Sequence, residues 1–111
     1  MINILDEVNE LKELILNSSE YKNYKNYLEL LEENKEIKKI VNDITRLQKE
    51  IVRLEHSNSD TKLREKELGN LYLKLNNYDI YNNYIEASIV LNELITNIQN
   101  NFQEFFDNLV S

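Results

Sequence analysis

Apolar residues recur every three or four positions along almost the whole chain, the spacing that places them on one face of an α-helix. The longest regular alternation of three and four consists of Ile37, Ile40, Ile44, Leu47, Ile51 and Leu54. Such a stripe is typical of helices that pack antiparallel or as a coiled coil. The other side of this segment carries charges of both signs three or four residues apart, which favours a solvated face. The pattern therefore predicts a long helix with one buried seam.

Polar clusters interrupt the apolar pattern and divide the chain into about five helices. Ser18 or Ser19 offers a cap for a helix over about 20–33, and Ser59 or Asp60 offers one for the fourth helix. The remaining stripes consist of Ile4, Val8, Leu11 and Ile15 in the first helix, Leu68, Leu71 and Leu75 in the fourth, and Ile80 to Leu109 in the last. We expect an all-α antiparallel helical bundle with long third and last helices, in which residues 1–111 form a single helical domain.

The composition excludes several kinds of chemistry. The chain has 111 residues with one Gly, one His and no Pro, Cys or Trp. Without cysteine there is neither a disulfide nor a thiolate ligand, and a single glycine cannot build a phosphate-cradling loop. We interpret His56 as a surface or helix C-capping residue, because no nucleophile accompanies it. The carboxylates lie opposite the apolar stripes. We therefore expect no enzyme activity, metal or cofactor.

The formal net charge is −7, and it is unevenly distributed: residues 79–111 hold five acids and no base, whereas residues 35–60 carry a net charge of +1. This balance opposes direct nucleic-acid binding, because the phosphate backbone is itself negatively charged. The alternative is an RNA-binding or RNase-associated protein that uses the basic face of residues 35–53, with Lys35, Lys38, Lys39, Lys49 and Arg53. No apolar run approaches the roughly 20 residues of a membrane span. We expect a cytoplasmic protein without membrane insertion.

The length of the last helix argues for self-association. A helix over 79–108 is roughly 45 Å long, whereas a compact chain of this size measures about 34 Å across. We therefore expect at least a dimer, with the acidic tail of one chain against the mildly basic 35–75 segment of the same or the partner chain. We place Tyr21, Tyr24 and Tyr84 in the core. The interface candidates are Tyr27, Tyr78, Tyr81, Phe102, Phe105, Phe106 and Leu109.

Several segments resemble the YlbF/YmcA family of small helical proteins from Gram-positive bacteria. They are the aromatic-rich residues 20–24, the acidic turn and helix start at 31–41, and residues 47–50 with Gln48. Leu75, Ile80, Tyr84, Ala87 and Leu91 are similar to the start of the family's last helix. The resemblance covers roughly residues 5–106.

The resemblance implies long antiparallel helices and dimers or larger oligomers, including complexes between related family members. It also implies a non-catalytic adaptor that supports competence, sporulation and biofilm formation by promoting RNA processing by RNase Y. Some members hold an iron–sulfur cluster with the help of a cysteine-containing tail. That property is not carried over, since the chain has no cysteine.

Overall fold

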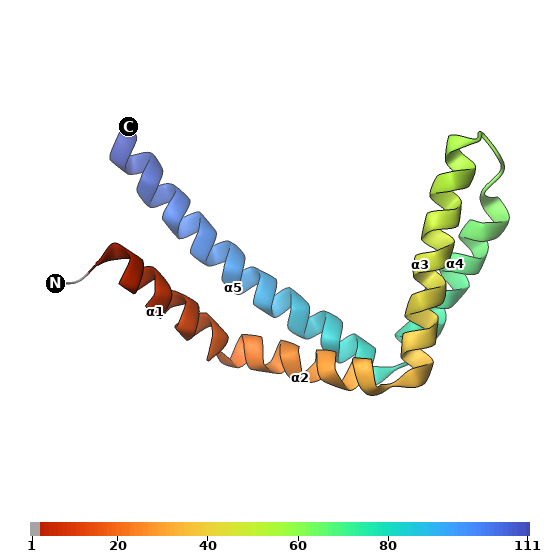
Figure 1. Cartoon of the computed structure of the whole chain (residues 1–111), viewed down its shortest axis with the longest axis horizontal. Coiled ribbons are helices and arrows are strands. Elements are labelled where there is room, and N and C mark those ends of the chain that lie inside the picture. Colours follow the sequence, from red (N-terminus) through yellow and green to blue (C-terminus); the bar gives the residue numbers. More distant parts are fainter. Residues whose placement is uncertain (1–2) are drawn as a thin grey trace. The chain divides into compact units, whose positions relative to one another are not determined.

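A computed structural model describes residues 3–111 and contains five helices, with no strand in that range. The helices are α1 (Ile4–Leu16), α2 (Ser19–Glu33), α3 (Lys35–His56), α4 (Lys62–Asn76) and α5 (Asp79–Val110), shown in Figure 1. The expected all-α fold with a long third and a long last helix is confirmed.

Polar side chains cap the starts of α1, α2 and α3, and on α1 the Asn3 side-chain oxygen accepts a hydrogen bond from the Leu5 N–H at 3.0 Å. The Ser18 hydroxyl accepts a hydrogen bond from the Tyr21 backbone N–H at 3.2 Å, and the Asn34 side-chain oxygen accepts one from the Ile37 N–H at 3.0 Å. Each bond satisfies a backbone donor that has no partner within its helix. Of the two serines predicted to cap α2, Ser18 is therefore the one that does so.

The loop after α3 explains why α4 begins later than predicted. Asn58 has a φ of 56°, and the Ser59 N–H donates to the Leu54 carbonyl at 2.9 Å, so these residues close the C-terminus of α3. The Ser59 hydroxyl bonds that of Ser57. Ser59 is thus unavailable as an N-cap, and the cap position is Thr61. The Asp60 carboxylate still accepts the Lys62 N–H at 3.0 Å.

The described chain divides into two compact units, and α2 and α5 contribute residues to both. The first, which we call the hairpin unit, comprises Leu28–Asn83 and contains α3 packed against α4. Its core consists of Ile37, Ile40, Ile44 and Leu75, with Leu31, Leu68, Leu71, Tyr78, Ile80 and Tyr81 packed around them. Leu47 and Ile51 continue the buried seam along α3. The stripe predicted for this helix is therefore the seam.

Polar contacts between α3 and α4 flank this seam. The Gln48 side-chain amide donates to the Tyr72 hydroxyl at 2.9 Å. Arg64 of α4 binds Glu50 of α3 at 2.9 Å and Glu67 of its own helix at 3.0 Å. These acids raise the pKa of the Arg64 guanidinium, mainly through the Coulomb attraction of Glu50. The contacts fix the register of the hairpin in addition to its apolar seam.

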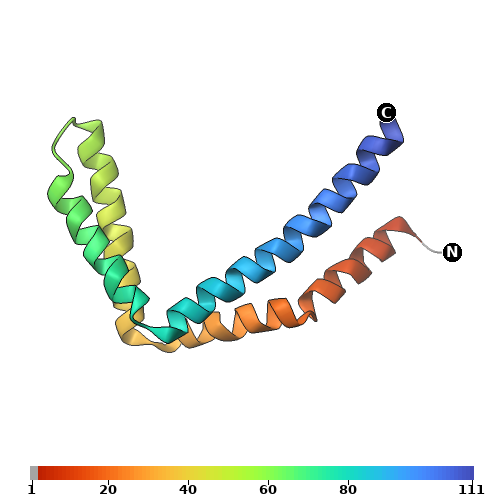
Figure 2. The same cartoon turned by 180° about the vertical axis from the view of Figure 1, so that it is seen from behind.

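The second unit, which we call the terminal unit, contains the residues up to Tyr27 together with Tyr84–Ser111. Here α1 and the start of α2 run alongside α5, and the first turn of α1 lies at the same end of the unit as the last turn of α5 (Figures 1 and 2). Tyr24 stacks on Tyr84 with ring centroids 5.5 Å apart. These two tyrosines and Tyr21, predicted to be core residues, are only partly buried. Leu91, at 8% exposure, is the one buried apolar side chain among the described residues of this unit.

Candidate interaction surface

One apolar stripe runs the length of α5 but is covered only in part. It passes from Leu91, which is 8% exposed, to Phe102 at 46%, Phe105 at 57% and Leu109 at 65%. The spacing keeps all four residues on one face of the helix. The same face that forms the core of the terminal unit therefore emerges uncovered toward the C-terminal end.

Three phenylalanines form a cluster on this uncovered end. The Phe102 and Phe106 rings stack with centroids 6.2 Å apart, and Phe105 meets Phe106 edge-on at 5.8 Å. Aromatic pairs at these separations attract one another beyond their shared burial. The cluster therefore presents a joined aromatic surface, because each ring is held by its neighbour.

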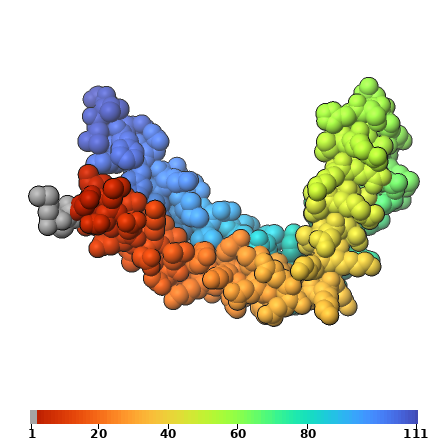
Figure 3. Space-filling model, viewed as in Figure 1, coloured from red at the N-terminus to blue at the C-terminus, as the bar shows by residue number. Residues whose placement is uncertain are grey.

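The apolar side chains of α1 likewise become more exposed toward the N-terminal end of the helix. Leu11 and Ile15 are partly buried, whereas Val8 is 41% and Ile4 81% exposed. Figures 1 to 3 show the first turns of α1 and the last turns of α5 at the same end of the terminal unit, where the two helices diverge. We call these exposed apolar ends the terminal surface. It comprises Ile4, Leu5, Val8, Phe102, Phe105, Phe106, Leu109 and Val110.

The sequence predicted which residues of α5 belong to this surface but did not predict the residues that α1 contributes. The apolar stripe with Ile4 and Val8 is visible in the sequence. Nothing in the sequence, however, tells how much of this stripe is buried against the rest of the chain. The predicted interface residues Phe102, Phe105, Phe106 and Leu109 lie together at one end of α5. Their exposure agrees with an interface role, which stays a prediction.

The acids of α5 lie away from its apolar stripe. Glu93 follows Leu91 by two residues and Glu104 follows Phe102 by two, a step of about 200° around the helix. Gln99, Asn101 and Asn108 instead stand at the edges of the stripe. The surface is thus apolar at its centre and bordered by neutral amides along α5, while its carboxylates face the opposite side.

The three tyrosines predicted as interface residues lie elsewhere. Tyr78 and Tyr81 pack against the core of the hairpin unit. The Tyr78 hydroxyl donates to the Glu36 carboxylate at 2.9 Å, and this hydrogen bond is the main reason that its pKa is raised. Tyr27 lines a shallow depression between α2 and α5 with Ala87 and Val90. The structure does not gather these tyrosines with the phenylalanines.

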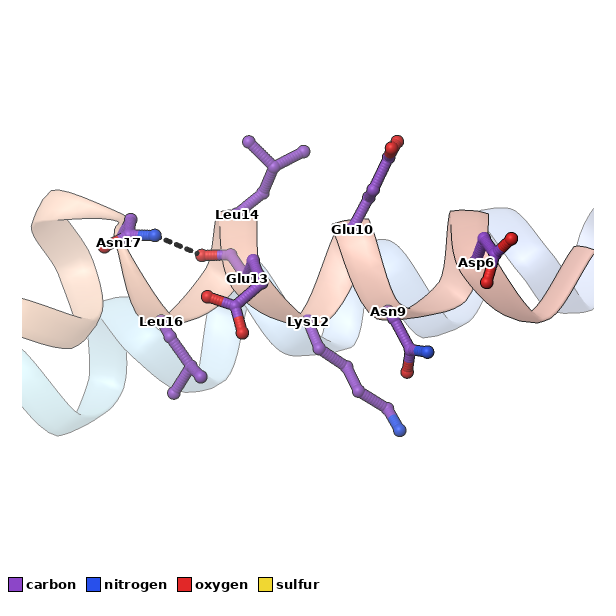
Figure 4. A pocket seen from close by; sticks show the side chains of 8 residues that line it. All are labelled: Asp6, Asn9, Glu10, Lys12, Glu13, Leu14, Leu16 and Asn17. Atoms are coloured by element: carbon purple, nitrogen blue, oxygen red, sulfur yellow. Dashed lines mark hydrogen bonds between the residues drawn. The ribbon is translucent and has the colours of Figure 1, made fainter. Parts of the chain in front are cut away.

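A surface depression on α1 provides no catalytic site. Its lining comes entirely from residues 6–16 of this one helix and its C-cap residue, and in Figure 4 the side chains of Glu10 and Leu14 point away from that of Lys12. Asn17 donates its side-chain amide to the Glu13 carbonyl at 2.9 Å. Over residues 3–111, no group of three or more His, Asp or Glu side chains is arranged to hold a metal ion. His56 is exposed at the last residue of α3.

The basic residues considered for RNA binding are exposed on α3. All five are on the side of the helix away from the seam: Lys35, Lys38, Lys39, Lys49 and Arg53. The ion pair of Arg46 with Asp43, at 3.6 Å, lies next to them. A cationic strip therefore exists within the hairpin unit. None of the helices in residues 3–111 is both long and apolar enough to cross a bilayer.

The arrangement defines the class of the protein: an all-helical chain whose long third helix packs in a hairpin and whose long last helix carries an apolar face that is covered only in part. The model of the family "Control of competence regulator ComK, YlbF/YmcA" matches residues 4–104, and the chain belongs to this family. No curated protein matches the chain. A similar structure is that of Bacillus subtilis RicA, solved in complex with RicF. The two chains share 17% identity with a TM-score of 0.82, over 97% of this chain and 96% of RicA, and the likeness establishes the fold.

Proposed function

We propose that the chain is a non-enzymatic regulator or adaptor that works through protein–protein contacts as an oligomer of at least two copies. The terminal surface is the observation that carries this proposal. Its side chains are 41–86% exposed and lie at the ends of two helices, and three of them are joined as the phenylalanine cluster of α5. Contiguous apolar patches of this kind mark interaction sites in soluble proteins.

The family suggests the setting of these contacts. Its name refers to control of competence, and the related RicA was solved with a protein partner. We propose that this chain likewise forms complexes with related family members in the cytoplasm and takes part in RNase Y-dependent RNA processing. No bound cofactor belongs to this role.

A second candidate function is direct RNA binding, and the cationic strip on α3 favours it. Lys35, Lys39, Lys49 and Arg53 span four to five turns of one helix, a length that allows several phosphate contacts. The net charge of −7 opposes such binding. We therefore place RNA binding second to protein binding.

Light scattering after gel filtration at micromolar concentration tests the oligomer. We expect a mass of at least two chains, and a 13.3 kDa monomer would contradict self-association. A pull-down from the source organism, read by mass spectrometry, tests the adaptor role and should recover related helical proteins. An RNA mobility shift that weakens with salt, and is lost when Lys49 and Arg53 are replaced by Gln, would instead favour the second function.

A further inference from the structure

We propose that the depression between α2 and α5 binds an arginine-bearing segment of another protein, with the guanidinium held by the carboxylates of Glu20 and Glu86. The depression lies wholly within the terminal unit and has a volume of about 450 Å³. Binding sites typically measure about 300–1,000 Å³. This inference rests on the proposed role in protein–protein contacts, and it names a contact site separate from the terminal surface.

Partly buried and acidic residues share the lining of this depression. Tyr27 and Ala87 are partly buried, and Val90 is 44% exposed. Glu20 of α2 and Glu86 of α5 are exposed and line the same depression from its two helices. The apolar part suits the carbon stem of a long side chain, and the carboxylates suit a cationic end. A long basic side chain therefore matches both parts.

The charges around the depression favour a cation. None of the described residues that line it is basic, and residues 79–111 contain no Lys or Arg. On α2, Lys22 and Lys25 lie about 140–160° around the helix from Glu20. The Ser19 hydroxyl donates to the Glu20 carboxylate at 2.8 Å, and this hydrogen bond is the main reason that the pKa of Glu20 is lowered. Glu20 therefore keeps its negative charge at neutral pH.

The tyrosine in the lining favours arginine over lysine. A guanidinium is planar, so it can stack on an aromatic ring while its N–H groups bond a carboxylate. The lysine ammonium is a compact, strongly hydrated charge without such a face. Of the three tyrosines predicted as interface residues, Tyr27 is the one that lines this depression. It supplies the ring that an arginine needs beside the two acids.

The size of the lining and the chain's own arginines favour a segment of another protein over a second copy. The α2 part of the lining runs from Ser19 to Tyr27, a length of about 12 Å that three or four extended residues cover. The chain has three arginines. Arg46 and Arg64 already form ion pairs with acids of their own chain, so a second copy could offer only Arg53.

Binding of a labelled peptide provides the first test. The probe is a six-residue peptide of alternating arginine and leucine. Its control carries citrulline, which has nearly the shape of arginine without the charge, at each arginine. We expect Glu20→Gln/Glu86→Gln to raise the Kd of the arginine peptide at least tenfold in fluorescence anisotropy. The wild-type chain should bind the citrulline peptide at least tenfold more weakly than the arginine peptide.

The matched control removes the same charge elsewhere in the terminal unit. Glu7 lies in the first turn of α1 as Glu20 lies in that of α2, and Glu104 lies within α5 as Glu86 does. We expect Glu7→Gln/Glu104→Gln to leave the Kd within about twofold, with equal helix content by circular dichroism in both double variants. Equal weakening by the two pairs would show that the peptide responds only to net charge, and would overturn the proposal.

Ala87 provides the second test, because it lines the depression and is the only alanine of the chain. Isotope labelling of alanine methyl groups therefore gives a single NMR signal from this site. We expect the signal to shift saturably with the arginine peptide. A peptide that binds without moving it lies elsewhere, and the proposal is then wrong. A signal that moves on dilution of the wild-type chain, but not of Arg53→Gln, would assign the depression to a second copy and also overturn it.

These tests separate the inference from the proposed function. A chain that is dimeric in light scattering, yet binds the arginine peptide no better than the citrulline peptide, would leave the proposed function in place and refute this site. A 13.3 kDa monomer whose Ala87 signal still shifts with the arginine peptide would support this site and contradict self-association.

Discussion

The Tyr78 hydroxyl donates a hydrogen bond to the carboxylate of Glu36, 42 residues earlier in the sequence, across 2.9 Å. It joins the segment between α4 and α5 to the first turn of α3. The same tyrosine ring packs against the hairpin core. The contact therefore closes the end of the hairpin opposite its loop, where the apolar seam finishes at Ile37.

This contact makes the stability of the protein depend on pH in the alkaline range. The hydrogen bond to Glu36 favours the neutral phenol, so the pKa of Tyr78 lies above its ordinary value of 10.0. A group whose pKa is raised by folding contributes stability below the unfolded pKa and loses it as pH rises through the folded pKa. We expect denaturant midpoints to fall above about pH 10, and to fall less in Tyr78→Phe. Identical pH profiles for the two proteins would show that the bond does not persist in solution.

The seam of α3 should dominate the stability of the hairpin unit. Ile44 is 6% and Ile51 9% exposed. Replacing either with Ala should cost about 2–5 kcal/mol in free energy of unfolding, since each change leaves a cavity. Asp43→Ala removes only a surface ion pair with Arg46 and should cost under about 0.5 kcal/mol. Urea denaturation at fixed protein concentration measures all three, and similar losses at Asp43 and Ile44 would show that the register is wrong.

The helical fold could be predicted from the sequence because apolar residues recur every three or four positions along almost the whole chain. The alternation from Ile37 to Ile51 specified the seam residue by residue, and the polar breaks at Asn34 and Asn77 fall at helix boundaries. The start of α4 could not be placed correctly, because it depends on Ser59 being used by the end of α3. That use follows from the left-handed backbone at Asn58, which is a local geometry that periodicity does not encode.

The interaction surface was predictable only in part. Phe102 and Phe105 continue an apolar stripe, and the length of the last helix predicted that part of this stripe would extend beyond the cover of its own chain. An apolar stripe in the sequence does not reveal, however, at which residue its burial against other helices ends. Ile15 and Ile4 occupy equivalent positions on α1, yet only Ile15 is partly buried. Conversely, Tyr78 was predicted to be an interface residue but packs against the core, because the segment that carries it turns back onto α3.

Gly69 offers a direct way to stabilise α4. It lies in the middle of the helix, and a Cβ built there would meet no heavy atom within 4 Å. Because glycine has the greater backbone freedom in the unfolded chain, Gly69→Ala should stabilise the hairpin by about 0.5–1 kcal/mol. The change should appear as a higher denaturant midpoint with an unchanged slope. A loss of stability would reveal that another helix approaches this position in the assembly.

The cap at the start of α3 leads to a last prediction, in which the same substitution at two asparagines of this segment has different effects on stability. The Asn34 side chain accepts the Ile37 N–H at 3.0 Å, and Ile37, at 1% exposure, is among the most buried residues of the core. Asn34→Ala leaves that donor without its partner and should destabilise the chain by about 0.5–2 kcal/mol. Asn42 is exposed within the same helix, where Ala is the better helix former, so Asn42→Ala should be neutral or stabilise by a few tenths of a kcal/mol. Asn34→Ser should recover most of the loss, because a serine hydroxyl can accept the same backbone hydrogen. Thermal and urea unfolding of the three variants decide the matter: if Asn34→Ala is as stable as Asn42→Ala, the Asn34 cap contributes nothing to holding the first turn of α3 against the core.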